Sequence, residues 1–149
     1  MDVKVFTTDA VVEIDGVKYH HHPNGGGMVA ETAHADDTAY IGPFAKICGR
    51  ARVLEQAHVF GSAWIFDEAE ISGTAEVFSN ARVFGNAPVS GDAKVFGDAK
   101  VFGNAAVSGY AEVSDSAEVF GDTRVSGRAK ITGDTKLFGE KRKEAAAAA

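Results

Sequence analysis

Residues 93–122 decide the fold, because they read AKVFGD, AKVFGN, AAVSGY, AEVSDS and AEVFGD in five consecutive units. The typical unit has a small residue, a variable one, an aliphatic one, Phe or Ser, Gly, and then Asp or Asn. The same pattern extends in both directions, from Val29 to Leu137, as nineteen units with no insertion or deletion. A short fixed period predicts a solenoid, in which each unit stacks on its neighbours.

Two positions of each unit are expected to point inward. The aliphatic position is Val, Ile or Leu in every unit but one, which has Ala35, and the small position is Ala through Ala117, then Thr123, Ala129 and Thr135. The four residues from the small one to Phe or Ser alternate inward and outward with the period of a strand. Gly and Asp or Asn supply the bend, since they tolerate left-handed backbone angles. An α-helix is excluded because glycine is too frequent and no 3.6-residue stripe exists.

This pattern resembles the hexapeptide-repeat superfamily, whose units have an aliphatic first and a small fifth residue. The resemblance covers about three quarters of the chain and implies an all-β, left-handed parallel β-helix. Such a helix is a triangular solenoid with three units per coil, a period of eighteen, which gives about six coils here. The run HPNGGGMVAETA before the repeats also resembles uncharacterised hexapeptide proteins that bacteriophages and mobile elements often carry.

The sequence predicts three segments along the chain: residues 1–28, 29–139 and 140–149. In the first, two apolar runs flank Asp15-Gly16 and end at Tyr19, which indicates a β-hairpin with a two-residue turn that caps the first coil. A Gly-rich loop, Gly25 to Gly27, then leads into the repeats of the second segment. The third segment, EKRKEAAAAA, favours a helix or a disordered tail.

Composition limits the functional classes. The formal charge is −6, with 15 basic and 21 acidic residues, which argues against a nucleic-acid binder. The single cysteine, Cys48, excludes an internal disulfide, and no apolar stretch approaches the roughly 18 residues of a membrane span. The first residues lack the basic and apolar regions of a secretory signal, so we expect a cytoplasmic or virion-associated protein.

Residues eighteen positions apart are expected to stack along one face of the predicted triangular solenoid. The position after the aliphatic residue is Phe on two faces and mostly Ser on the third, where Asp36 and Leu54 precede the serines. The first face has Phe66, Phe84, Phe102, Phe120 and Phe138, with Trp64 beside them; the second has Phe60, Phe78 and Phe96; the third has Ser72, Ser90, Ser108 and Ser126.

Eight outward phenylalanines predict association, because a soluble monomer rarely leaves more than about 400 Å² of contiguous apolar surface exposed. Stacking of the rings on one another is the alternative use of such columns. Because the two aromatic faces meet at one edge, the first face of one subunit can pack on the second face of the next and close a three-fold ring. We therefore expect a homotrimer whose interface is formed by the phenylalanines and Trp64.

Histidines are the first candidates for chemistry. His20, His21 and His22 are possible metal ligands, although a solvated loop before Pro23 fits them better. Coenzyme A-dependent acyl transfer is common among proteins of the family that the repeat resembles, and His58, followed by His34, is the candidate general base. These two histidines fall on different faces, and the uninterrupted repeat offers no loop that would build a pocket. No cofactor is expected.

The preferred hypothesis is a non-enzymatic trimeric β-solenoid that serves as a structural, adaptor or binding module, with a phage origin suggested by the second resemblance. The first alternative is an acyltransferase-like enzyme with its site at a subunit cleft. The second is a protein that sequesters a small anionic ligand between subunits through Arg52, Arg82 or Lys94. A further protein partner is compatible with the first hypothesis.

Overall fold

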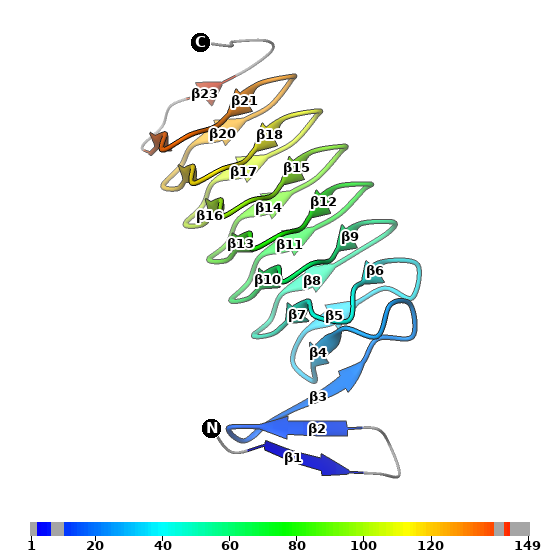
Figure 1. The fold of residues 1–149 in the computed structure, drawn as a ribbon. Coiled ribbons are helices and arrows are strands. Elements are labelled where there is room, and N and C mark those ends of the chain that lie inside the picture. Colours follow the sequence, from blue (N-terminus) through cyan, green and yellow to red (C-terminus); the bar gives the residue numbers. More distant parts are fainter. Residues whose placement is uncertain (1–2, 7–10, 139–141, 144–149) are drawn as a thin grey trace.

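The computed structural model describes residues 3–6, 11–138 and 142–143, and this part of the chain forms strands, turns and loops with no helix. Short strands stack into a three-sided rod, with an antiparallel extension at its N-terminal end (Figure 1). The extension consists of β1 (Val3–Phe6), β2 (Val11–Ile14) and β3 (Val17–His21). It continues into β4 (Met28–Ala30), the first strand of the rod.

Each side of the rod is one sheet of two-residue strands. Sheet A contains the first face: after β4 come β7 (Lys46–Ile47), β10 (Trp64–Ile65), β13 (Arg82–Val83), β16 (Lys100–Val101), β19 (Glu118–Val119) and β22 (Lys136–Leu137). Sheet B contains the third face: β5 (His34–Ala35), β8 (Arg52–Val53), β11 (Glu70–Ile71), β14 (Pro88–Val89), β17 (Ala106–Val107), β20 (Arg124–Val125) and β23 (Arg142–Lys143). Sheet C contains the second face: β6 (Tyr40–Ile41), β9 (His58–Val59), β12 (Glu76–Val77), β15 (Lys94–Val95), β18 (Glu112–Val113) and β21 (Lys130–Ile131).

Neighbouring strands of the rod are parallel, and each residue is in register with the residue one coil later. Trp64 pairs with Arg82, for example, and Ile65 pairs with Val83, so one coil takes up three units of the repeat. Main-chain bonds connect the coils, as where the N–H of Phe102 donates to the carbonyl oxygen of Val119 at 2.9 Å. The predicted solenoid of about six coils, each of three units, is confirmed, and this is the architecture of the hexapeptide-repeat resemblance. Left-handedness stays a prediction.

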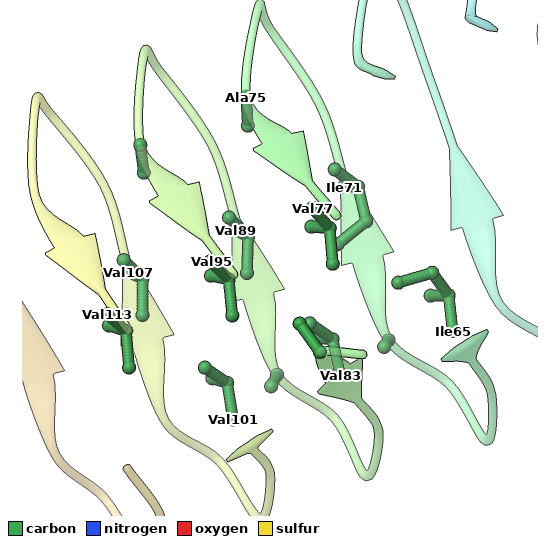
Figure 2. Close-up of a cluster of buried hydrophobic side chains, with 14 of the residues drawn as sticks. Ile65, Ile71, Ala75, Val77, Val83, Val89, Val95, Val101, Val107 and Val113 are labelled. Carbon is green, nitrogen blue, oxygen red and sulfur yellow. The ribbon is translucent and has the colours of Figure 1, made fainter. Parts of the chain in front are cut away.

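The core is a narrow column of small side chains inside the rod. Valine, isoleucine and alanine point inward from all three sheets, and Val83, Val101 and Ala99 are 0% exposed (Figure 2). Each coil brings its inward aliphatic side chains against those of the coils before and after it. Large side chains have no room in such a core, which explains why the small position of the repeat is almost always alanine.

The residue two places after the aliphatic one forms each tight corner. From Gly49 to Gly133 it has a left-handed backbone, with a φ of 70° at Gly85 and 68° at Gly103. A Cβ added at Gly85 would lie 2.7 Å from the backbone nitrogen of Gly103 in the next coil, so glycine is favoured by contact as well as by φ. The Asp or Asn of the unit follows this residue, so the expectation that it supplies the left-handed bend was wrong for most units. Asp67 and Asp115 do so because they stand where other units have glycine.

At Glu55, Asp67 and Asp115, left-handed corners without glycine, a carboxylate bonds the next coil, whereas the corner at Ser79 has no carboxylate. Glu55 Oε1 accepts the N–H of Gly73 at 2.7 Å, and Asp67 Oδ2 accepts that of Gly85 at 3.1 Å. Asp115 Oδ2 does the same for Gly133 at 3.0 Å. These bonds offset the strain of a left-handed residue with a side chain.

The N-terminal hairpin is confirmed. β2 and β3 pair antiparallel around a turn with φ values of 52° at Asp15 and 83° at Gly16, as a two-residue hairpin requires. The sequence-based interpretation missed β1, which extends the hairpin to three strands. It also did not foresee that β3 pairs antiparallel with β4, so that the cap becomes part of sheet A.

The loop after β3 covers the start of sheet C. Asn24 accepts the N–H of Ile41 at 3.0 Å through its main-chain oxygen, and Gly27 donates its N–H to the main-chain oxygen of Ile41 at 2.9 Å. His22 lies beneath this loop and is only 3% exposed. Its Nε2 donates to the carbonyl oxygen of Asp36 at 2.9 Å, while Nδ1 accepts the N–H of Asn24 at 3.1 Å. The histidine therefore closes the end of the rod.

At the other end, the expected segment 140–149 contributes β23, which pairs in parallel with β20 and continues sheet B. Residues 142–143 are therefore a strand, while the rest of that segment lies outside the described residues. The division of the chain at residue 139 stays a prediction.

We predict that Gly85→Ala destabilises the protein more than Gly133→Ala does. Both glycines have a left-handed backbone, with a φ of 66° at Gly133, but a Cβ at Gly133 has nothing within 4 Å. Backbone strain costs each variant about 1–2 kcal/mol, and the clash with Gly103 adds about 1–3 kcal/mol to the first. Denaturant unfolding measures both free energies. Equal losses would show that contact between corners does not restrict this position.

Candidate functional site

The phenylalanines form two ladders along the rod. On sheet A, the rings of Phe84 and Phe102 stack with centroids 4.8 Å apart and planes 1° apart, and Phe138 ends this ladder at 5.3 Å from Phe120. On sheet C, Phe78 stacks on its two neighbours at 4.9 Å. Each inner ring covers the faces of the rings on either side, so the ladders are partly buried, whereas Phe138 is 57% exposed. The rings stack on one another, as one of the two predictions has it. They also leave apolar edges at the surface, so association of subunits through these rings stays a prediction.

The outward serine column, which forms the third face, lies on sheet B. Its serines, Ser72, Ser90, Ser108 and Ser126, are partly buried and leave this side free of large aromatic rings. The three columns therefore lie where the three-unit period predicts them. Sheets A and C are aromatic and sheet B is not, so the rod has two apolar sides and one polar side.

Trp64 is the centre of the densest side-chain cluster on sheet A. Its indole N–H donates to the sulfur of Cys48 at 3.0 Å. Lys46 lies over the ring at 5.1 Å and Arg82 at 5.5 Å, so the indole lies between two cations. Tyr19 of the cap also contacts Lys46, and burial, followed by the neighbouring Cys48, raises the pKa of Tyr19. The cap and the first coils are thus joined at this cluster.

A groove lies on each side of Trp64. The first, of about 360 Å³, is lined by Met28, Pro43, Phe44, Ala45, Lys46, Ser62, Ala63 and Trp64. The second, of about 490 Å³, is lined by Ser62, Trp64, Asn80, Arg82, Asp98 and Lys100. Phe44 is 81% exposed at the rim of the first groove. The sequence-based interpretation missed both grooves, because their lining residues come from different coils. The only signals are Cys48, which breaks the Phe or Ser pattern, and Trp64, a large aromatic residue at the variable position.

The two candidate general bases lie on different sheets, as predicted. His34 is on sheet B, where its Nε2 bonds Asp36 Oδ1 at 2.8 Å. His58 is on sheet C, exposed, with its ring 5.9 Å from that of Tyr40. Neither histidine lines either groove beside Trp64. A single chain therefore does not bring His34 and His58 to one reacting group.

The three neighbouring histidines do not converge either. His20 and His21 are exposed on β3, and His21 Nδ1 bonds the carbonyl oxygen of Gly26 at 2.9 Å. Both ring nitrogens of the buried His22 are occupied by main-chain groups, so the expectation of a solvated loop is wrong for this residue. In the described part of the chain, no group of three or more His, Cys, Asp or Glu side chains is placed to hold a metal ion.

The cations proposed for an anionic ligand are separated as well. Arg52 lies on sheet B, 3.3 Å from Glu70 Oε2, while Arg82 lies on sheet A and Lys94 on sheet C. No single site in one chain can contain all three. Of the three cations, Arg82 lines the second groove beside Trp64.

Comparison with known proteins identifies no relative. No family model matches the chain, and neither the curated proteins nor the solved structures contain a match. The suggested likeness to bacteriophage proteins therefore has no support from these comparisons. Among the described residues, none belongs to a helix long and apolar enough to cross a membrane.

We predict a pH-dependent contribution of Asp36 to stability. The N–H of Glu55, 2.8 Å from Oδ2, and then the His34 imidazole hold the pKa of this carboxyl below its usual range near 4. The ionised form is therefore favoured by folding, and its contribution is present above that range and lost as the pH falls through the lowered pKa. Asp36→Asn should lower the Tm at pH 7, and the difference from wild type should vanish in strong acid.

Asp37→Asn is the control, because the neighbouring Asp37 makes no hydrogen bond to any other described residue. Thermal scans monitored by circular dichroism from pH 2 to pH 7 measure both variants. A difference between Asp36→Asn and wild type that does not change over this range would contradict the assigned cause.

Proposed function

We propose that this protein is a non-enzymatic structural or adaptor module, a rigid rod that assembles with two further copies of itself through the phenylalanine ladders. One observation supports it above all: two neighbouring sides of the rod have aromatic ladders whose edges remain at the surface, and the third side has serines. Apolar side chains arranged on two adjacent sides suit a closed ring better than a two-fold contact.

The uninterrupted repeat supports a structural role. From Val29 to Leu137 the coils contain no inserted loop, so the rod lacks the protruding segments that usually build a substrate pocket. Its stiffness comes from main-chain bonds between successive coils. A location in the cytoplasm or on a virion is part of this proposal.

In the proposed trimer, sheet A of one subunit packs on sheet C of the next. Both surfaces have ladders of rings that repeat once per coil, so their edges can interdigitate over the coils of Phe60, Phe78 and Phe96, which form the ladder of sheet C. Charged residues beside the ladders set the register of neighbouring subunits along the rod axis. On sheet C, Glu76, Lys94, Glu112 and Lys130 follow one another in direct register.

We predict that the wild-type protein is a trimer and that the double variant Phe84→Asp, Phe102→Asp is a monomer, because the new carboxylates would be buried without partners. Ser90→Asp with Ser108→Asp is the matched control, since it adds the same charges at the same repeat position on sheet B. Light scattering coupled to size exclusion measures the three masses. A monomeric wild type overturns the proposal.

Because the rings also stack within one chain, the aspartates reduce stability as well as association. Phe84→Ser with Phe102→Ser addresses this, since serine occupies the same position of the folded coil at Ser90 and Ser108. This variant should remain folded by circular dichroism and yet be monomeric. A folded serine variant that stays trimeric would show that these rings do not form the interface.

A further inference from the structure

The outward charged residues of sheet A do not alternate in sign along the rod, whereas those of sheet C do. Along sheet C, acidic and basic residues alternate from strand to strand, with Glu76 beside Lys94 and Lys94 beside Glu112. On sheet A, Arg82 of β13 is in direct register with Lys100 of β16. Like charges opposite one another on neighbouring strands are unfavourable. The pair is therefore a local cost, offset only in part by the Trp64 ring beside Arg82 and by Glu118 beside Lys100.

Neither of these cations is neutralised by an ion pair. Within the described residues, neither Arg82 nor Lys100 forms a salt bridge with a carboxylate, although Lys100 has Glu118 in register on its other side. The contact of Arg82 is with the ring of Trp64, at 5.5 Å. Arg82 is exposed and Lys100 partly so, which leaves donor groups of both side chains accessible.

Both cations line the larger groove beside Trp64, which has a volume of about 490 Å³. Ser62, Asn80 and Asp98, one from each of three successive coils, also line this groove. The groove thus combines two cationic donors, an amide and a hydroxyl, and one carboxylate. Its volume lies in the range of small-molecule sites and exceeds that of an inorganic anion.

We propose that this groove binds a small molecule of about monosaccharide size that has an oxyanion group, with Arg82 and Lys100 holding the oxyanion. A phosphate, sulfate or carboxylate placed between the two cations would remove their mutual repulsion and form charge-assisted hydrogen bonds. Asp98 accepts a hydrogen bond from a hydroxyl or amino group of the rest of the ligand, and Asn80 and Ser62 supply further polar contacts. A bare polyanion fits less well, because Asp98 lies in the wall.

The site is independent of the acyl-transfer and metal hypotheses, since none of the five histidines lines it. It lies on sheet A, so in the proposed trimer a neighbouring subunit would border the bound molecule. The inference does not require the trimer, because all six lining residues belong to one chain.

Titration of the full-length protein with glucose 6-phosphate, followed by NMR or calorimetry, tests the proposal. We expect saturable binding, a much weaker response to glucose, and weaker binding at high salt. Arg82→Gln and Lys100→Gln should each weaken binding by about tenfold or more, the loss expected for one charge-assisted bond. Inorganic phosphate in the same assay measures binding of the oxyanion without the sugar. Glucose 6-sulfate measures binding when a different oxyanion is joined to the same sugar.

Arg124→Gln is the matched control, because it removes the same charge at the same repeat position on sheet B, outside the proposed subunit interface. It should bind like wild type. Equal weakening by this variant, or equal binding of glucose and glucose 6-phosphate, would overturn the proposal, as would the absence of saturable binding to each of the anions tested. Light scattering on the same samples reports the oligomeric state separately, so a failure to bind and a failure to associate are distinguished.

Discussion

Main-chain hydrogen bonding between coils, in a register of three whole units, is the constraint on which the rest of the structure depends. The N–H of one strand reaches the carbonyl oxygen of the next coil, as from Phe102 to Val119, and the same bond recurs along all three sheets. Because no unit is longer or shorter than six residues, every position of the repeat stacks on an equivalent position. The core, the corners and the surface are therefore all organised as columns.

Specific side-chain contacts occur at the few positions where the residue type of a column changes from one coil to the next. The phenylalanine ladder of sheet A begins only at Phe66, where Trp64 of the same coil and Cys48 of the coil before it form the cluster that joins the cap to the rod. Beyond Trp64, the row of outward residues has two cations in succession. The regular part of the rod provides stiffness and surfaces for association, whereas the irregular part contains the grooves.

Much of the fold could be predicted from sequence, because it follows from short-range periodicity. Valine and alanine at fixed positions indicate the inward side chains, and Asp15-Gly16 indicates the hairpin turn. Features that depend on contacts across coils or loops could not be predicted in the same way. His22 is buried because a loop folds over it onto Asp36, and Glu55 takes a left-handed corner because its carboxylate reaches Gly73. The larger groove beside Trp64 could not be predicted for the same reason, since Arg82, Lys100 and Asn80 come together only once the coils are stacked.

The strict register also limits how such a chain can change its length. Loss or duplication of three consecutive units removes or adds one whole coil and leaves every later column on its own sheet. Loss of a single unit also largely preserves the core, because nearly all units have a small and an aliphatic inward residue, but it rotates all later units by one side of the triangle. Loss of a unit between Phe66 and Phe84 would place the rings of Phe84 and Phe102 on sheet C, in line with Phe60. Genes for this rod can therefore grow by tandem duplication in steps of one full coil without disturbing its surfaces, while smaller steps interchange its sides.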